Sequence, residues 1–161
     1  MSVRCFPNTK RGGKLATVLL GAILCAIVPN SFSRALSPAD EWDEVFNTAR
    51  AVLARIDAGR IDTIKDQALR EAVRRAYLAL KACAKVNKNQ SRSIKQATVA
   101  EFERAFKDVE KGIEVGEYQA CAAKCKAEGA ECEKGCASAR KKICGCKMNQ
   151  FGCVVTRCLF S

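Results

Sequence analysis

The chain has 161 residues, of which 28 are basic, 17 are acidic, 11 are cysteine and none is histidine. This length allows one domain with a modest core, with or without a small appendix. Without histidine, the chain lacks the commonest general base and the usual activator of serine and cysteine nucleophiles. Most familiar hydrolase mechanisms are therefore excluded.

Residues 1–35 have the order of a secretory signal peptide. Four basic and no acidic side chains precede an apolar run over residues 15–28, and Pro29 and small residues follow it. Small residues at the −3 and −1 positions predict cleavage after Ser33 or Ala35. An uncleaved membrane anchor is the alternative, but this run is shorter than the roughly 20 residues that span a bilayer. We therefore expect a secreted or lumenal protein whose mature chain has no stable membrane span.

Charge and cysteine divide the mature chain into two regions. Removal of residues 1–35 lowers the net charge from +11 to +6, because this segment holds five basic residues and no acidic one. Residues 36–118 carry 15 basic and 14 acidic side chains, whereas residues 119–161 carry 8 and 3. The last 41 residues also hold eight cysteines. We therefore predict a helical bundle over residues 36–117 and a basic, cysteine-rich tail over residues 118–161.

The first helix of the predicted bundle has a clear start signal. Ser37 is a suitable N-cap, Pro38 suits the first helical position, and Asp40 adds an acid in the first turn. Gly59 can end this helix. Its apolar residues recur at steps of three and four, as one buried stripe requires: Trp42, Val45, Phe46, Ala49, Val52, Leu53 and Ile56.

Two further stripes predict a second and a third helix. The second runs from Ile61 to Cys83 and ends in a polar loop over residues 87–93. The third begins at a capping box formed by Thr98 and Glu101, and it ends before Gly116. No segment alternates for long at period two. The expected fold class is all-α, an antiparallel helical bundle followed by a disulfide-stapled hairpin and a cysteine-rich tail.

The order of residues across this bundle resembles a known family. The resemblance rests on the segments Ala51-Val-Leu-Ala-Arg-Ile-Asp57, Ala68-Leu-Arg70, Ala76-Tyr-Leu-Ala-Leu80 and Val99-Ala-Glu-Phe-Glu-Arg-Ala-Phe-Lys-Asp-Val-Glu110. Through these segments, residues 45–115 resemble the PsbQ-like extrinsic four-helix-bundle subunits of photosystem II. This resemblance implies a thylakoid-lumen protein that binds by its surface and performs no chemistry. The cysteine-rich tail departs from that family.

The first half of the tail, residues 118–143, predicts a helical hairpin. Cys121 and Cys125 lie one helical turn apart, and so do Cys132 and Cys136. A reversal at Gly129 between two short helices would pair Cys121 with Cys136 and Cys125 with Cys132. In this pattern the tail resembles the α-hairpinin peptides, which implies a toxin, antimicrobial or protease-inhibitory module as an alternative function.

The second half of the tail, residues 144–161, is predicted to be irregular. It contributes four more disulfide cysteines, which are Cys144, Cys146, Cys153 and Cys158. Their pairing stays open, because eight tail cysteines allow 105 connectivities. A thiolate metal site is the competing interpretation, but a secretory route oxidises thiols and the spacing differs from the usual Cys-x2-Cys. We therefore expect disulfides and no metal.

Cys83 is the ninth cysteine of the mature chain and has no obvious partner. It lies on the apolar stripe of the second helix with Tyr77 and Leu80. A buried free thiol is the expected state, because free cysteine is commonly buried. Intermolecular pairing is the alternative.

Basic side chains in the tail are the candidate partner-binding residues. They could contact an acidic protein or an anionic surface. Nucleic acid is not expected, because aromatic side chains do not interleave with the charges. The clustered acids Asp40, Glu41, Asp43 and Glu44 fit a helix N-terminus better than a catalytic site. We therefore predict a non-enzymatic binding protein without a cofactor, whose candidate contacts are Lys124, Lys126, Arg140, Lys141, Lys142, Lys147 and Arg157.

Overall fold

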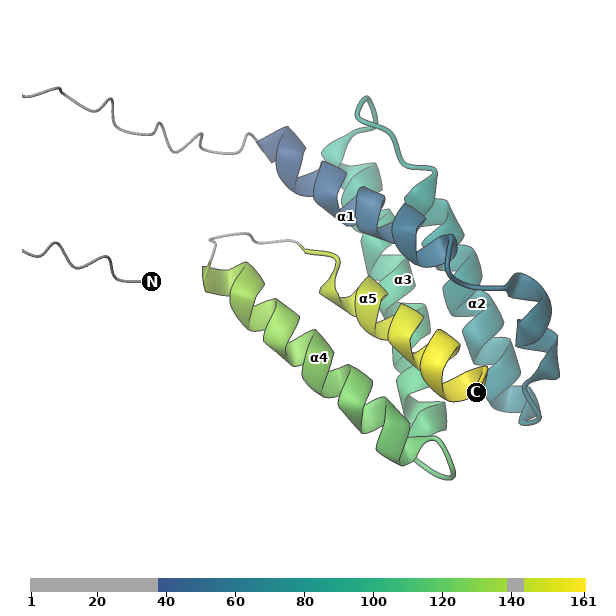
Figure 1. Cartoon of the computed structure of the whole chain (residues 1–161). Helices are drawn as coiled ribbons and strands as arrows, with labels where there is room; N and C mark the ends of the chain where they lie inside the picture. Colours follow the sequence, from purple (N-terminus) through teal and green to yellow (C-terminus); the bar gives the residue numbers. More distant parts are fainter. Residues whose placement is uncertain (1–37, 139–143) are drawn as a thin grey trace, which may run out of the picture. The chain divides into compact units, whose positions relative to one another are not determined.

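The computed structural model describes residues 38–138 and 144–161, which all lie in one compact unit, Ala35–Ser161. Within these two ranges all regular structure is helical, as the sequence predicts (Figure 1). The predicted signal peptide and its cleavage sites lie outside the described residues. So do three of the candidate contacts, Arg140, Lys141 and Lys142.

The first three α-helices form the predicted antiparallel bundle. Helix α1 spans Pro38–Leu53, α2 spans Gln67–Ala84, and α3 spans Arg92–Ile113. A short 3-10 helix, η1, spans Ala58–Thr63 between α1 and α2. Helix α1 begins at the proline that the sequence marks as the first helical position, so that prediction is confirmed.

Two helix starts differ from the sequence prediction. Helix α2 begins six residues after Ile61, because the Asp66 carboxylate accepts a 2.8 Å hydrogen bond from the Leu69 amide and caps the helix there. Helix α3 begins before the expected capping box, with Ser91 as its N-cap. Thr98 therefore lies inside α3, where its hydroxyl donates to the Ile94 carbonyl at 2.8 Å.

The predicted apolar stripes meet in a single core. Phe46, Phe102 and Phe106 are almost fully buried, as are most valines and alanines of the three stripes. Phe151, from the tail, joins this core. Its ring packs edge-on against Phe102 at 5.8 Å and against Phe106 at 5.6 Å between centroids.

The tail does not reverse at Gly129, so the predicted turn is wrong. Residues Gln119–Ser138 form one continuous helix, α4, which passes through this glycine. A Cβ atom at Gly129 would lie 3.0 Å from Gln150 Oε1. Glycine at this position thus serves the close approach of α4 to the segment that follows it in the chain, rather than a turn.

The segment predicted to be irregular is also helical. Helix α5 spans Cys146–Cys153, and a π-helix, η2, spans Val154–Leu159. Figure 1 shows α5 antiparallel to α4 and beside it, so a helical hairpin is present, but α4 and α5 form it. The apolar residues of this segment are buried in the common core, namely Phe151, Val154, Val155, Leu159 and Phe160.

The second arm of the hairpin consists of α5 and η2. Four disulfides connect α4 to this arm and to Cys144 just before it. The predicted pairing of Cys121 with Cys136, and of Cys125 with Cys132, is wrong. On one straight helix those partners are separated along the axis by about 22 Å and 10 Å, too far for a disulfide. The observed bonds join Cys121–Cys158, Cys125–Cys153, Cys132–Cys146 and Cys136–Cys144.

Two further contacts hold the second arm against the bundle. A Cβ atom at Gly152 would lie 2.8 Å from Val52 Cγ1, so only glycine allows α5 to lie this close to α1. The Arg60 guanidinium donates to the Phe160 carbonyl and lies 4.8 Å from the centre of the Phe160 ring. The hairpin is thus packed onto the bundle through α5 and η2.

Candidate interaction surface

The predicted partner-binding cations of the tail are partly neutralised within the protein. Arg157 donates to Glu128 at 2.8 Å, and the Lys147 ammonium lies 3.8 Å from carboxylate oxygens of both Glu110 and Glu133. Lys147 and Arg157 therefore contribute less free positive charge than the sequence suggests.

Two other predicted contacts remain exposed on α4. Lys124 and Lys126 have no acidic partner among the residues that the structure describes. A third exposed lysine of this helix, Lys134, pairs with Glu131 at 3.4 Å. Of the tail's described cations, only Lys124 and Lys126 remain available for the predicted acidic partner.

A second cationic segment lies in the bundle, outside the residues predicted to bind a partner. Residues 72–100 contain seven basic side chains and no acidic one. The charge balance of residues 36–118 is close to neutral, and this average conceals the segment. A charge count in a sliding window would have found it.

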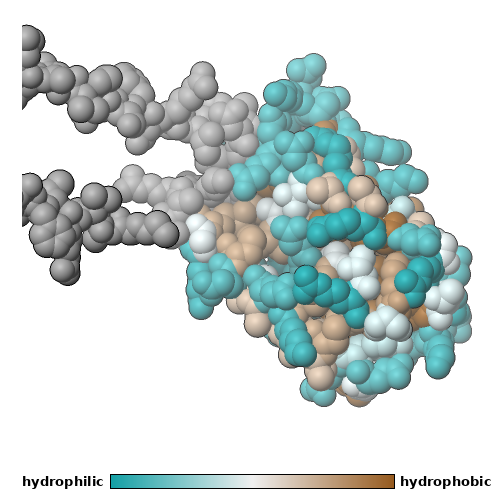
Figure 2. All heavy atoms as spheres, viewed as in Figure 1, coloured by the Kyte–Doolittle hydropathy of each residue, from teal (hydrophilic) through white to brown (hydrophobic). Residues whose placement is uncertain are grey.

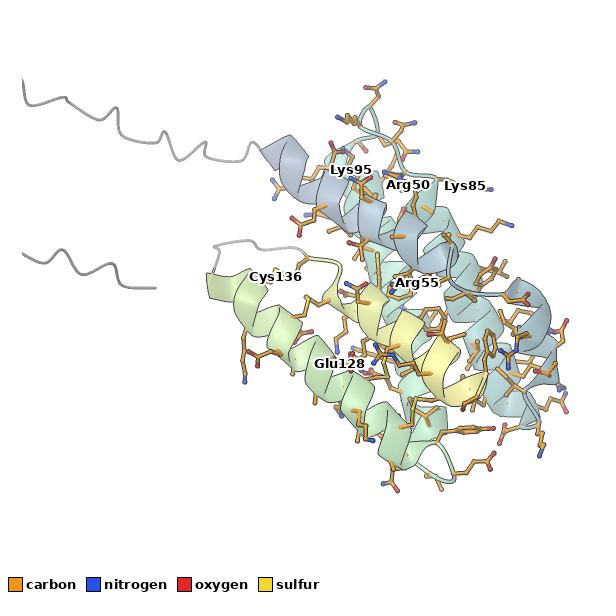
Figure 3. All side chains as sticks on the ribbon, viewed as in Figure 1. Arg50, Arg55, Lys85, Lys95, Glu128 and Cys136 are labelled. Carbon is orange, nitrogen blue, oxygen red and sulfur yellow. A yellow bond between two sulfur atoms is a disulfide. The ribbon has the colours of Figure 1, made fainter. Side chains whose placement is uncertain are left out.

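The turn between α2 and α3 gathers part of this charge at one end of the bundle. Figure 3 shows Arg50, Lys85 and Lys95 near one another, from α1, the end of α2 and α3. Figure 2 shows hydrophilic residues covering the same end of the molecule, at the top of the view. We call this surface the cationic end, and its members are Arg50, Lys81, Lys85, Lys88, Arg92 and Lys95.

Three members of the cationic end have structural roles. The Arg50 guanidinium donates to the Ala84 carbonyl at 3.0 Å, and Lys95 Nζ donates to the Lys88 carbonyl at 3.0 Å. Lys95 is only 7 % exposed. Lys88 itself pairs with Asp43 at 3.1 Å. The two hydrogen bonds satisfy the carbonyls of Ala84 and Lys88, at and just after the C-terminus of α2. Positive charge at this end also complements the helix dipole.

The other three members are exposed and have no such structural role. Lys81, Lys85 and Arg92 are exposed, and within the described ranges none of them has an acidic partner. Two of the exposed large apolar side chains lie on the same two helices, Leu78 at 56 % and Ile94 at 48 % exposure. Cations beside isolated apolar side chains are suited to an acidic partner that also offers some apolar surface.

Cys83 is the buried free thiol that the sequence predicts. Its side chain is fully buried, and its sulfur lies 3.5 Å from the Thr98 carbonyl oxygen. Burial raises the pKa of Cys83 to about 12, with Glu103 adding repulsion of the thiolate. This thiol therefore stays protonated and out of reach, so it is a poor nucleophile.

Three tail sulfurs lie close enough to hold a metal ion if they were thiolates. The sulfur atoms of Cys121, Cys125 and Cys158 all lie within 4.8 Å of one another. In the structure, however, each belongs to a disulfide, and a metal would need deprotonated thiolates. The observed chemistry of this cluster is that of a covalent cross-link.

Comparison with known proteins adds no relative. No protein-family model matches the chain, and no curated protein or solved structure is significantly similar to it. The resemblances to PsbQ-like subunits and α-hairpinins therefore stay predictions. Among the described helices, none is long and apolar enough to cross a membrane.

Proposed function

We propose that this protein is a non-enzymatic binding protein of the secretory route, and that it holds an acidic macromolecular partner against its cationic end. The supporting observation is the run of seven cations without an acid over residues 72–100, of which Arg74, Arg75 and Lys88 pair with acids from outside the run. Exposed Lys81, Lys85 and Arg92 give this run a side that is not neutralised internally. Such a surface raises both the association rate and the selectivity for an acidic partner.

Four disulfides within the last 41 residues support an extracellular or lumenal setting, because reducing compartments keep thiols reduced. The proposed signal peptide would deliver the chain there. Expression in a secreting host, followed by N-terminal sequencing of the released protein, tests this part. We expect the mature chain to begin at Arg34 or Leu36. A cell-associated protein that still carries residues 1–35 would contradict it.

A charge-reversal experiment tests the binding surface. The variant K81E/K85E/R92E reverses the charge of the three exposed cations that have no structural role, and R104E/K107E/K111E makes the same charge change on the outer side of α3. Binding of fluorescein-labelled polyglutamate is measured by anisotropy at several salt concentrations. We expect the first variant to lose roughly tenfold in affinity and the second less than about threefold, because only local charge contacts the probe.

Each outcome of this comparison is informative. Circular dichroism and urea unfolding confirm that both variants keep the native fold before binding is compared. Equal loss in the two variants would show that net charge alone drives binding, and it would remove the cationic end from the proposal. Loss that appears only on changing Lys124 and Lys126 would return the partner site to the tail.

A further inference from the structure

The four disulfides differ in how accessible their sulfurs are along the α4–α5 hairpin. Where α4 meets η2, Cys125 and Cys158 are 1 % and 3 % exposed. At the opposite end, Cys132 is exposed, Cys136 and Cys144 are partly exposed, and Cys146 is 1 % exposed. Cys121 and Cys153, the partners of Cys158 and Cys125, are also partly exposed. Cys136–Cys144 is thus the one of these four disulfides in which neither cysteine is buried. Figure 3 shows Cys136 near the C-terminal end of α4. We call the Cys136–Cys144 bond the terminal disulfide.

A cavity gives access to the terminal disulfide and to the one beside it. Its volume is about 210 Å³, and all four cysteines of the two bonds line it. Glu44 and Thr48 of α1 contribute to its lining. A cavity of this size admits the cysteinyl group of a small thiol. Because Glu44 lines this cavity, its charge does not attract a thiolate, and access and sulfur spacing are what favour exchange here.

The sulfurs of the two bonds lie in contact across this cavity. Cys144 Sγ is 3.3 Å from Cys146 Sγ, although the two atoms belong to different disulfides. The corresponding contact at the buried end, between Cys125 and Cys158, measures 3.9 Å. A thiolate formed at Cys144 is therefore already next to a second disulfide, and exchange with it requires little movement.

From these contacts we propose that the terminal disulfide is an exchange site for a low-molecular-weight thiol, and that exchange there generates a free thiol on Cys132. The proposal concerns covalent chemistry of the hairpin and does not depend on the cationic end. It assigns the first attack to the terminal disulfide, because each of the other three bonds contains one buried cysteine.

The reaction has two balanced steps. The incoming thiolate attacks Cys136 Sγ and forms a mixed disulfide there, and the electron pair of the broken bond leaves on Cys144 as a thiolate. The Cys144 thiolate then attacks Cys146 Sγ, forms a Cys144–Cys146 bond and expels the Cys132 thiolate, which takes a proton from water. One thiol is consumed and one is produced, so no external oxidant or reductant is needed.

Mass spectrometry of the oxidised protein after brief exposure to reduced glutathione tests the proposal. N-Ethylmaleimide traps free thiols at each time point, and peptide mapping locates every adduct and bond. We expect glutathione on Cys136, maleimide on Cys132 and a Cys144–Cys146 bond. We also expect this region to react roughly tenfold faster than Cys121–Cys158. Reaction first at Cys121–Cys158 or Cys125–Cys153, or glutathione on Cys144, would overturn the proposal.

Two matched double variants separate the steps. C132S/C146S removes the neighbouring bond, so glutathione should still add to Cys136 while maleimide now labels Cys144. C125S/C153S removes one bond at the other end, and it should give the same adducts and bonds at Cys132, Cys136, Cys144 and Cys146 as the unmodified protein. Should C132S/C146S fail to fold, the map of the unmodified protein still decides. Maleimide on Cys144 beside an intact Cys132–Cys146 bond in that map would overturn the second step.

Discussion

The bundle of α1, α2 and α3 and the single helix α4 are stabilised in different ways. Each bundle helix buries a stripe of large apolar side chains in a common core. Helix α4 buries only small groups, including Ala122, Cys125 and Gly129, and it carries two glycines in its interior. Glycine weakens a helix by about 0.5–1 kcal/mol relative to alanine. Burial therefore holds the bundle, whereas disulfides hold α4.

The second arm of the hairpin, α5 with η2, connects these two modes. It shares three disulfides with α4, and a fourth joins α4 to Cys144 just before α5. It also places Phe151 and its other apolar residues in the bundle core. A short cysteine-rich segment can thus hold a weakly apolar helix against a protein, provided that the segment itself is well buried. The predictions below test this division of roles.

Complete reduction of the disulfides should have the largest effect, and it should be confined to α4. A single bond that closes 37 residues, such as Cys121–Cys158, restricts the unfolded chain by on the order of 4 kcal/mol. Without the four bonds, α4 should lose its amide protection while α2 and α3 keep most of theirs. Hydrogen exchange read by mass spectrometry, with and without reductant, checks this. Loss of protection in all helices together would show that the bundle also depends on the disulfides.

Phe151→Ala should destabilise the whole molecule rather than the hairpin alone. The ring is fully buried and packs edge-on against Phe102 and Phe106. Its removal should cost about 3–5 kcal/mol, since a large cavity opens in the core. Urea unfolding measures this loss. Leu78→Ala, at an exposed position on α2, is the control and should change stability by less than about 0.5 kcal/mol. If Phe151→Ala loosened only α4 and α5, the common core would be disproved.

The bundle could be predicted well because its residues leave few alternatives. Stripes such as Val45, Phe46 and Ala49 fix which face of a helix is buried. A capping residue is less decisive, since both Ser91 and Thr98 are suitable N-caps and only the core selects between them. The predicted start of α3 was therefore wrong, because two start signals competed there.

The hairpin was predicted incorrectly for a related reason. Glycine serves both turns and close helix contacts, so Gly129 by itself does not distinguish a turn from a continuous helix. Cysteines one helical turn apart show which face they share, but they do not show which segment faces them. The apolar residues of 144–161 span too few turns for their period to be recognised, so their helix was missed.

Cys83 provides a test of burial inside the bundle. A thiol whose pKa is raised in the folded state favours its protonated form. This contribution to stability is complete below the ordinary pKa near 9, and it is lost as pH rises from there to about 12. Between pH 8 and pH 10 the unmodified protein should lose on the order of 1 kcal/mol more stability than Cys83→Ala, which has no thiol to ionise. Parallel losses, measured by urea unfolding at the two pH values, would mean that solvent reaches this sulfur.

The smallest effect should come from the ion pair that links α4 to η2. Arg157 and Glu128 are 2.8 Å apart, but their side chains are 64 % and 57 % exposed, so water and salt screen the attraction. A double-mutant cycle with R157Q and E128Q should therefore give a coupling energy of about 0.2–1 kcal/mol. Urea unfolding of the oxidised protein at low and high salt measures this coupling, which should shrink at high salt. A coupling above about 2 kcal/mol would exceed what an exposed pair supplies, and it would mean that non-covalent contacts hold α4 as firmly as its disulfides do.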